Sequence, residues 1–259
     1  MKHRIAILSL LVTLLIILTA AIPVQNKNAL IRAPRISVKE GTSTNWAGYA
    51  VPISTTKKSQ TIVTDVQGWW KVPAAQPSNI DSWSSNWVGI DGYSSSSVEQ
   101  IGTESDWSGG APRYYAWWEM YPKPSYLIPY TVNSGDNMYG DVSYSNGNFI
   151  LTLTDYGSGK TKAMWTFQIT QKSGKAQQNS AEWIVEAPWS GGVLPLANFG
   201  TTGFTGATTT IGNVTGSIGS WDSAAFIDMV DSNGNIIAKT SSLSGKGSSF
   251  TVTWQPPLN

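Results

Sequence analysis

The sequence of 259 residues contains no cysteine, and its single histidine is His3, close to the N-terminus. The lack of cysteine excludes disulfides, thiol catalysis and zinc sites built on cysteine. Because His3 falls in an N-terminal leader, the mature domain also lacks the residues for Ser-His-Asp, Cys-His or histidine-ligated metal chemistry. If the domain is an enzyme, carboxylates, amides, hydroxyls and lysines must carry out the reaction.

Charged residues are scarce as well: they make up 13% of the chain, whereas about 25% is usual. Residues 1–41 hold six Lys and Arg against one Glu, a net charge of +5, which leaves a net charge of −4 for the rest. The sequence has no basic patch of the kind that would indicate a nucleic-acid partner. A chain with few carboxylates gains little positive charge in acid, so the composition suits an acidic habitat. A salt-rich habitat or ordinary secretion would fit it equally well.

The N-terminal leader begins with a basic tetrapeptide and continues as a nearly unbroken apolar run, Ile5–Leu18, followed by small residues that suit signal cleavage. We therefore expect a signal peptide over residues 1–21 and a secreted protein, although the run is also long enough for an uncleaved anchor. Residues 22–43 are basic and contain Pro23 and Pro34. We expect this segment to be a linker; the alternative is a short pro-segment that masks a cleft at neutral pH.

From Thr44 onward the sequence has the pattern of short strands and turns, with no amphipathic helix of useful length. Thr44–Val51 and Thr61–Val72 alternate as strands do, and Ser85–Gly92 and Ala207–Gly216 are among the further predicted strands. Asn146-Gly147 is a typical hairpin turn. Short repeats are absent, which argues against propellers and solenoids. We predict one all-β domain over residues 44–259, an antiparallel β-sandwich of two packed sheets.

The stretch Ser180–Ser190, S-A-E-W-I-V-E-A-P-W-S, places two carboxylates on one face of a predicted strand. Alternation puts Glu182 and Glu186 on that face and Trp183 on the other. The flanking tryptophans favour an aromatic floor around Glu186, where neighbouring groups would set its pKa and allow acid–base chemistry. Alternatively, both glutamates are ordinary solvent-facing residues of a half-buried strand.

Three further polar residues stand next to aromatic or glycine residues. Asp91 lies in W-V-G-I-D-G, where an Asp-Gly turn alone would explain it. Glu119 lies in W-W-E-M-Y-P and shares a strand face with Trp117 and Tyr121, as a site carboxylate or as a buried structural acid. Gln100, taken alone, would be a surface amide.

Several sequence blocks follow one another in a characteristic order. They are W-V-G-I-D-G-Y at 87–93, V-E-Q-I-G at 98–102, Y-A-W-W-E-M-Y-P at 115–122, A-E-W-I-V-E at 181–186 and L-P-L-A-N-F-G-T at 194–201. Together with N-W-A-G at 45–48, they resemble the glutamic peptidases, the eqolisin family (peptidase G1), over about residues 44–210.

This resemblance implies a lectin-like sandwich and an acid endopeptidase that acts on protein or peptide substrates. It also implies a reaction without metal, other cofactor or covalent intermediate, and insensitivity to pepstatin. The resemblance places the catalytic glutamine at Gln100 and the catalytic glutamate at Glu186. The substrate-binding positions fall on Trp46, Trp87, Asp91, Trp117 and Glu119. We expect a monomer with no nucleic-acid partner and no membrane contact beyond the N-terminal anchor alternative.

The chain departs from the family pattern at two acids and in its lack of disulfides, which members of fungal origin carry. Ala187 follows the glutamate where the family commonly has Asp, and Tyr115 stands where it often has Asp. Two other functions stay open. One is a secreted glycoside hydrolase that uses Glu119 and Glu186, and the other is a carbohydrate-binding module with exposed tryptophans. The glycoside hydrolase alternative gives Gln100 no role.

Overall fold

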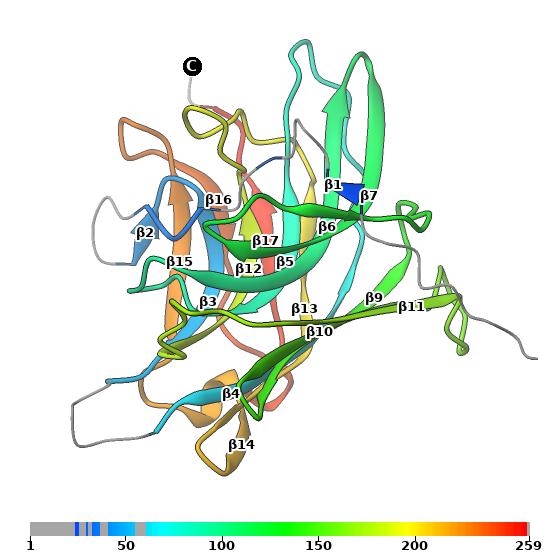
Figure 1. Cartoon of the computed structure of the whole chain (residues 1–259). Helices are drawn as coiled ribbons and strands as arrows, with labels where there is room; N and C mark the ends of the chain where they lie inside the picture. The colour runs from blue at the N-terminus through cyan, green and yellow to red at the C-terminus, as the bar shows by residue number, and fades with distance from the viewer. Residues whose placement is uncertain (1–23, 26–29, 31–32, 37–40, 55–60, 258–259) are drawn as a thin grey trace, which may run out of the picture.

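The computed structural model of the chain describes residues 24–25, 30, 33–36, 41–54 and 61–257. The leader predicted over residues 1–21 therefore lies outside the described residues. Within the described part, nearly all regular structure is β-strand (Figure 1), with two short 3-10 turns at Ile218–Ser220 and Gly245–Gly247. No helix among these residues is long and apolar enough to cross a membrane.

The strands form two sheets. Sheet I has the order β1 (Val24–Gln25), β8 (Tyr126–Ile128), β7 (Ala111–Tyr121), β6 (Val98–Ser108), β5 (Ser85–Ile90), β12 (Ser180–Glu186), β3 (Trp46–Pro52) and β15 (Ala225–Val230). Sheet II has the order β11 (Trp165–Gln171), β10 (Asn148–Asp155), β9 (Asn137–Ser145), β4 (Val63–Lys71), β13 (Thr201–Ile211), β17 (Phe250–Trp254), β16 (Ile236–Thr240) and again β15. All of these pairings are antiparallel. Two short strands complete the fold: β14 (Val214–Ser217) beside β13, and β2 (Thr42–Ser43), which runs parallel to β15.

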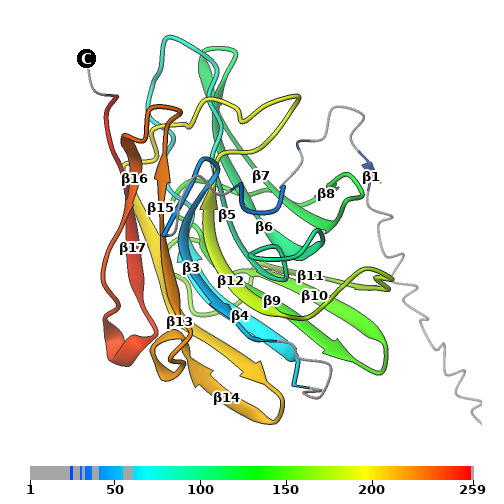
Figure 2. The same ribbon diagram turned by 90° about the vertical axis from the view of Figure 1, so that its left-hand side faces the viewer.

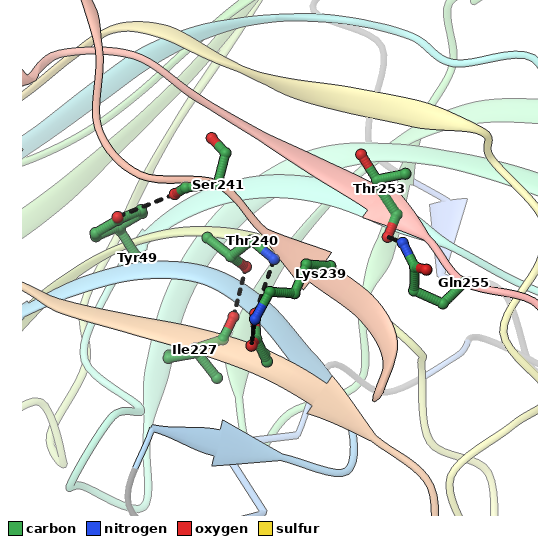
Figure 3. Close-up of polar contacts among 8 residues, drawn as sticks. Tyr49, Ile227, Lys239, Thr240, Ser241, Thr253 and Gln255 are labelled. Carbon is green, nitrogen blue, oxygen red and sulfur yellow. Dashed lines mark hydrogen bonds and ion pairs between the residues drawn. The ribbon is translucent and has the colours of Figure 1, made fainter. Parts of the chain in front are cut away.

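Strand β15 belongs to both sheets and closes the sandwich along one edge. Its first half pairs with β3, and its last residues pair with β16 (Figure 3). The hydroxyl of Thr240 donates to the carbonyl of Ile227 at 2.6 Å, and Lys239 Nζ lies 2.7 Å from the Asp228 carboxylate. Across the same edge, the Tyr49 hydroxyl donates to the Ser241 carbonyl at 3.0 Å. These contacts hold the two sheets together.

The main hydrophobic core lies between the sheets, which curve around it (Figure 2). Its bulk comes from aromatic side chains of both sheets, including Trp118 and Trp183 from sheet I and Trp70 from sheet II. The indole N–H of Trp183 reaches across to the carbonyl of Gln67 at 2.9 Å, and that of Trp70 reaches Thr103 Oγ1 at 2.9 Å. Because Trp70 and Trp183 both have an acceptor, these two rings add buried apolar area without an unpaired donor.

The observed fold confirms the predicted all-β sandwich of two antiparallel sheets. The expected strand over Ala207–Gly216 is wrong in its bounds, because β13 ends at Ile211 and β14 runs back from Val214. Gly212 makes the reversal with φ of 60°, a left-handed conformation that glycine adopts without steric cost.

Candidate active site

Strand register brings most of the predicted site residues to one face of sheet I, the face that points away from the main core. Residues directly opposite one another, and residues two apart along a strand, share a face. The first row across the sheet is Glu119, Gln100, Gly89, Glu182 and Ala50. The second row is Trp117, Gly102, Trp87, Ile184 and Gly48. The third row is Tyr115, Glu104, Ser85, Glu186 and Trp46.

Nearly all of this face is buried, although it carries several carboxylates. Every residue of β12 is buried, and the side chains of Glu182 and Glu186 are 0% exposed. The alternative of a half-buried strand with solvent-facing glutamates is therefore wrong. Burial raises the pKa of Glu182 well above its ordinary value, because the ionised form loses its hydration.

The carboxylate of Glu186 is held by donors on both of its oxygens. The indole N–H of Trp87 donates to Oε2 at 2.8 Å, and the side-chain amide of Asn45 donates to Oε1 at 3.4 Å. The ring of Trp46 meets that of Trp87 edge-on, with centroids 4.9 Å apart. These contacts fix the direction in which the Glu186 carboxylate points.

The side chain of Gln100 is fixed by the neighbouring carboxylate on β7. Its Nε2 donates to Glu119 Oε2 at 2.7 Å, which sets the orientation of the amide. Strand β5 lies between the strand of Gln100 and that of Glu186, and Trp87 occupies the row between them. Gln100, Glu186 and Trp87 are all 0% exposed.

Asp91 lies apart from these rows. It follows β5 with φ of 74°, in the predicted turn, and its carboxylate accepts backbone N–H groups from Gln177, Gln178 and Asn179 at 2.7 to 2.9 Å. The side chain therefore anchors the loop that leads into β12. The structure does not bring it into the same rows as Gln100 and Glu186.

Glu104 and Asn45 are polar residues beside this site for which no role was predicted. Glu104 stands four residues after Gln100 on β6, so strand alternation alone could have found it. Asn45 precedes Trp46 in the N-W-A-G block, but its contact with Glu186 spans 141 positions of sequence, and no local pattern signals it.

Part of the predicted linker also lies against this face. The Trp46 indole N–H donates to the carbonyl of Ala33 at 3.1 Å, and the backbone N–H of Arg35 donates to the carbonyl of Gly92 at 3.2 Å. The Arg35 guanidinium sits 4.1 Å from the centre of the Tyr93 ring, a cation–π contact. A cavity of about 370 Å³ remains between residues 33–36 on one side and Tyr121 and Trp189 on the other.

A larger cavity, of about 630 Å³, lies at sheet II and is lined by Trp69, Lys71 and Thr205 among others. None of its lining residues belongs to the three rows described above. We therefore place the candidate active site on sheet I, where the buried polar groups are concentrated.

Several solved structures that match this fold are glutamic peptidases. A scytalido-glutamic peptidase bound to a transition state analog inhibitor matches with a TM-score of 0.67 and 22% identity, over 82% of this chain and 98% of that one. SCP-B, a member of the eqolisin family in complex with the tripeptide Ala-Ile-His, matches with a TM-score of 0.62 and 22% identity over the same shares. Aspergilloglutamic peptidase from Aspergillus niger matches with a TM-score of 0.58 and 29% identity, over 67% of this chain and 99% of that one.

The model of the Peptidase A4 family matches residues 44–254, so the chain belongs to that family. It is an endopeptidase with the glutamic peptidase fold, as the resemblance of its sequence blocks predicted. A search of curated proteins finds no match.

Proposed function

We propose that the protein is a secreted acid endopeptidase in which Gln100 and Glu186 activate a water molecule against the peptide bond. The observation that carries this proposal is the placement of both side chains on one buried face, each already oriented by a neighbour. A glutamine suits the role of the hydrogen-bond donor to the reacting carbonyl oxygen, because its amide donates without titrating. A glutamate suits the role of the base, because it can take up a proton and release it again.

The reaction would begin with Glu186 as a carboxylate that takes a proton from the water. The water oxygen then attacks the scissile carbonyl carbon, and the Gln100 amide N–H donates to the oxygen that becomes negative. Protonated Glu186 passes its proton to the leaving nitrogen as the carbon–nitrogen bond breaks. The step needs no metal and forms no covalent bond to the enzyme.

The remaining predicted residues would bind the substrate or orient the dyad. Glu119 orients Gln100, and Trp87 orients Glu186, through the contacts described above. Trp46 and Trp117 would form apolar walls for an extended peptide. Asp91 would act by holding the loop before β12 in place. Because an ordinary glutamate has a pKa of about 4.3 and a base works best near its own pKa, we expect activity at acidic pH.

The test is to purify the Gln100→Ala and Glu186→Gln variants and to measure peptide release from denatured protein at acidic pH. We expect Gln100→Ala to lower the rate by roughly 10²- to 10³-fold and Glu186→Gln to reduce it to background, because the base is gone. As a matched control, Gln168→Ala removes an amide from β11, where its contact with Thr152 is exposed, and should leave the rate unchanged.

Substantial activity in either dyad variant, with its melting temperature retained, would contradict the assignment. A panel of polysaccharides assayed beside the protein substrate tests the glycoside hydrolase alternative, which would release reducing sugar instead of peptides. N-terminal sequencing of the protein recovered from the culture medium tests secretion and gives the processing site.

A further inference from the structure

We propose that Asn45 is a positioning residue that connects the backbone of the bound peptide to Glu186 through a single side-chain amide. This inference rests on the proposed function, since it assigns Glu186 the role of the base. It adds a residue that none of the motif blocks singled out for a role in the reaction.

The hydrogen-bond partners of Asn45 fix the orientation of its amide. The backbone N–H of Ile36 and the hydroxyl of Ser43 both donate to Asn45 Oδ1, at 2.9 and 2.8 Å. A backbone N–H can only donate, so Oδ1 must be on that side. Nδ2 therefore faces the acceptors on the other side, which include Glu186 Oε1 at 3.4 Å.

The same Nδ2 also faces the backbone of the N-terminal segment. It lies 3.4 Å from the carbonyl oxygens of both Ala33 and Pro34. The Trp46 indole N–H reaches the Ala33 carbonyl as well, at 3.1 Å. Two neighbouring side chains of the site thus donate to carbonyl groups of a peptide segment.

Residues 33–36 therefore show how this face holds a peptide chain. The segment lies beside Glu186, and the cavity of about 370 Å³ continues along it toward Tyr121 and Trp189. We infer that a substrate backbone takes the place of this segment, with its carbonyl groups at Asn45 and Trp46. An amide that touches both the peptide and the base would set the distance between them, and errors of about 1 Å in such placement cost roughly 10²-fold in rate.

The test is the Asn45→Asp variant of the full chain, assayed with a fluorogenic peptide at acidic pH. The substitution keeps an oxygen for the Ile36 N–H and replaces the donor that faces Glu186. We expect kcat to fall by at least roughly tenfold, because Glu186 is no longer held, and KM to rise, because a contact to the peptide backbone is lost.

The matched control is Asn148→Asp, which makes the same substitution in the exposed hairpin between β9 and β10, where the amide donates to the carbonyl of Asn146 at 3.0 Å. This hairpin belongs to sheet II and contacts none of the three rows, so kcat and KM should stay within about threefold of the wild type. If Asn45→Asp does not fold, as judged by its melting transition, Asn45→Ser replaces it with the same expectations.

The proposal is overturned if the folded Asn45 variant keeps both kcat and KM within about threefold of the wild type, or if Asn148→Asp lowers kcat equally. The second result would mean that the loss does not come from the contacts of Asn45 with Glu186 and the peptide backbone. Failure of the proposed function would look different, since the Gln100 and Glu186 variants would then stay active whatever the result at Asn45.

Discussion

At the scale of single residues, the site depends on donors that come from outside the Gln–Glu pair. Of the two hydrogen bonds described above for Glu186, the shorter is donated by the indole N–H of Trp87, with Nε1 2.8 Å from Glu186 Oε2. Trp87 occupies the centre of the face and is 0% exposed, so water cannot replace its N–H without a rearrangement. A hydrogen bond to a charged group is worth about 1.5–3 kcal/mol.

Replacing Trp87 by Phe keeps an aromatic ring and removes this donor. We expect kcat to fall by about tenfold or more, because the carboxylate of Glu186 is less firmly oriented. Steady-state kinetics on the purified variant measure the effect.

The control is Trp70→Phe, which deletes an indole N–H of similar geometry, bound to Thr103 in the main core. It should lower the melting temperature with little change in kcat. Equal losses of kcat in the two variants would mean that Trp87 serves packing alone.

At the scale of strands, glycines allow the large side chains of the face to lie over their neighbours. Gly102 stands between Trp117 and Trp87 in the second row. A Cβ at Gly102 would lie 2.4 Å from the carbonyl oxygen of Asn86 and 2.6 Å from Cβ of Trp87. Cβ atoms in proteins essentially never lie closer than 3.0 Å to such an atom, so strand β5 would have to move.

We therefore expect Gly102→Ala to lower the free energy of unfolding by about 1–3 kcal/mol, the usual cost of overpacking a core. Activity should fall as well, because Trp87 shifts with its strand. Chemical denaturation measures the first effect and peptide hydrolysis the second. Gly174→Ala is the control: nothing lies within 4 Å of its new methyl group, so its effect should stay within about 0.5 kcal/mol. A Gly102→Ala protein as stable as the wild type would show that the strands adjust freely.

At the scale of the whole molecule, buried carboxyl groups link stability to pH. Burial, and next the charge of Asp91, raise the pKa of Glu99 from 4.5 to about 8. On sheet II, burial raises the pKa of Asp65 from 3.8 to about 7, with the charge of Asp141 as the second cause. The pKa of Asp141 rises from 3.8 to about 6, mainly through burial. In each case the folded protein favours the neutral form.

These pKa values predict a protein that is more stable in acid than at neutral pH. Between the unfolded and folded pKa values the native state binds more protons, so the free energy of unfolding falls as pH rises. For Glu99 the loss runs from pH 4.5 to about 8, at up to about 1.4 kcal/mol per pH unit. Denaturation curves across this range measure the slope.

We expect Glu99→Gln to make the slope smaller, because the group that titrates is gone. Asp231→Asn is the control: hydrogen bonds from Asn235 lower the pKa of this carboxyl below 3.8, so its titration lies outside the range. Unchanged slopes in Glu99→Gln would show that this carboxyl titrates normally in the folded protein.

The sequence by itself determined the fold class and which face of the strand carries the two glutamates. Alternation in A-E-W-I-V-E put Glu182 and Glu186 on one face and Trp183 on the other, and the structure confirms this arrangement, with Trp183 in the main core. The lack of cysteine also excluded disulfides and thiol catalysis. Local periodicity is sufficient to predict which side chains of a strand share a face, because the pleat makes successive side chains point to opposite faces.

Only the tertiary structure decided which residues meet across the chain. Asn45 contacts Glu186 over 141 positions, and Asp91 binds the backbone of residues 177–179. Strand β15 closes the sandwich by pairing in both sheets, which its own sequence does not reveal. Such contacts depend on the register between distant strands, and register follows from the packing of the whole core, which no local pattern records.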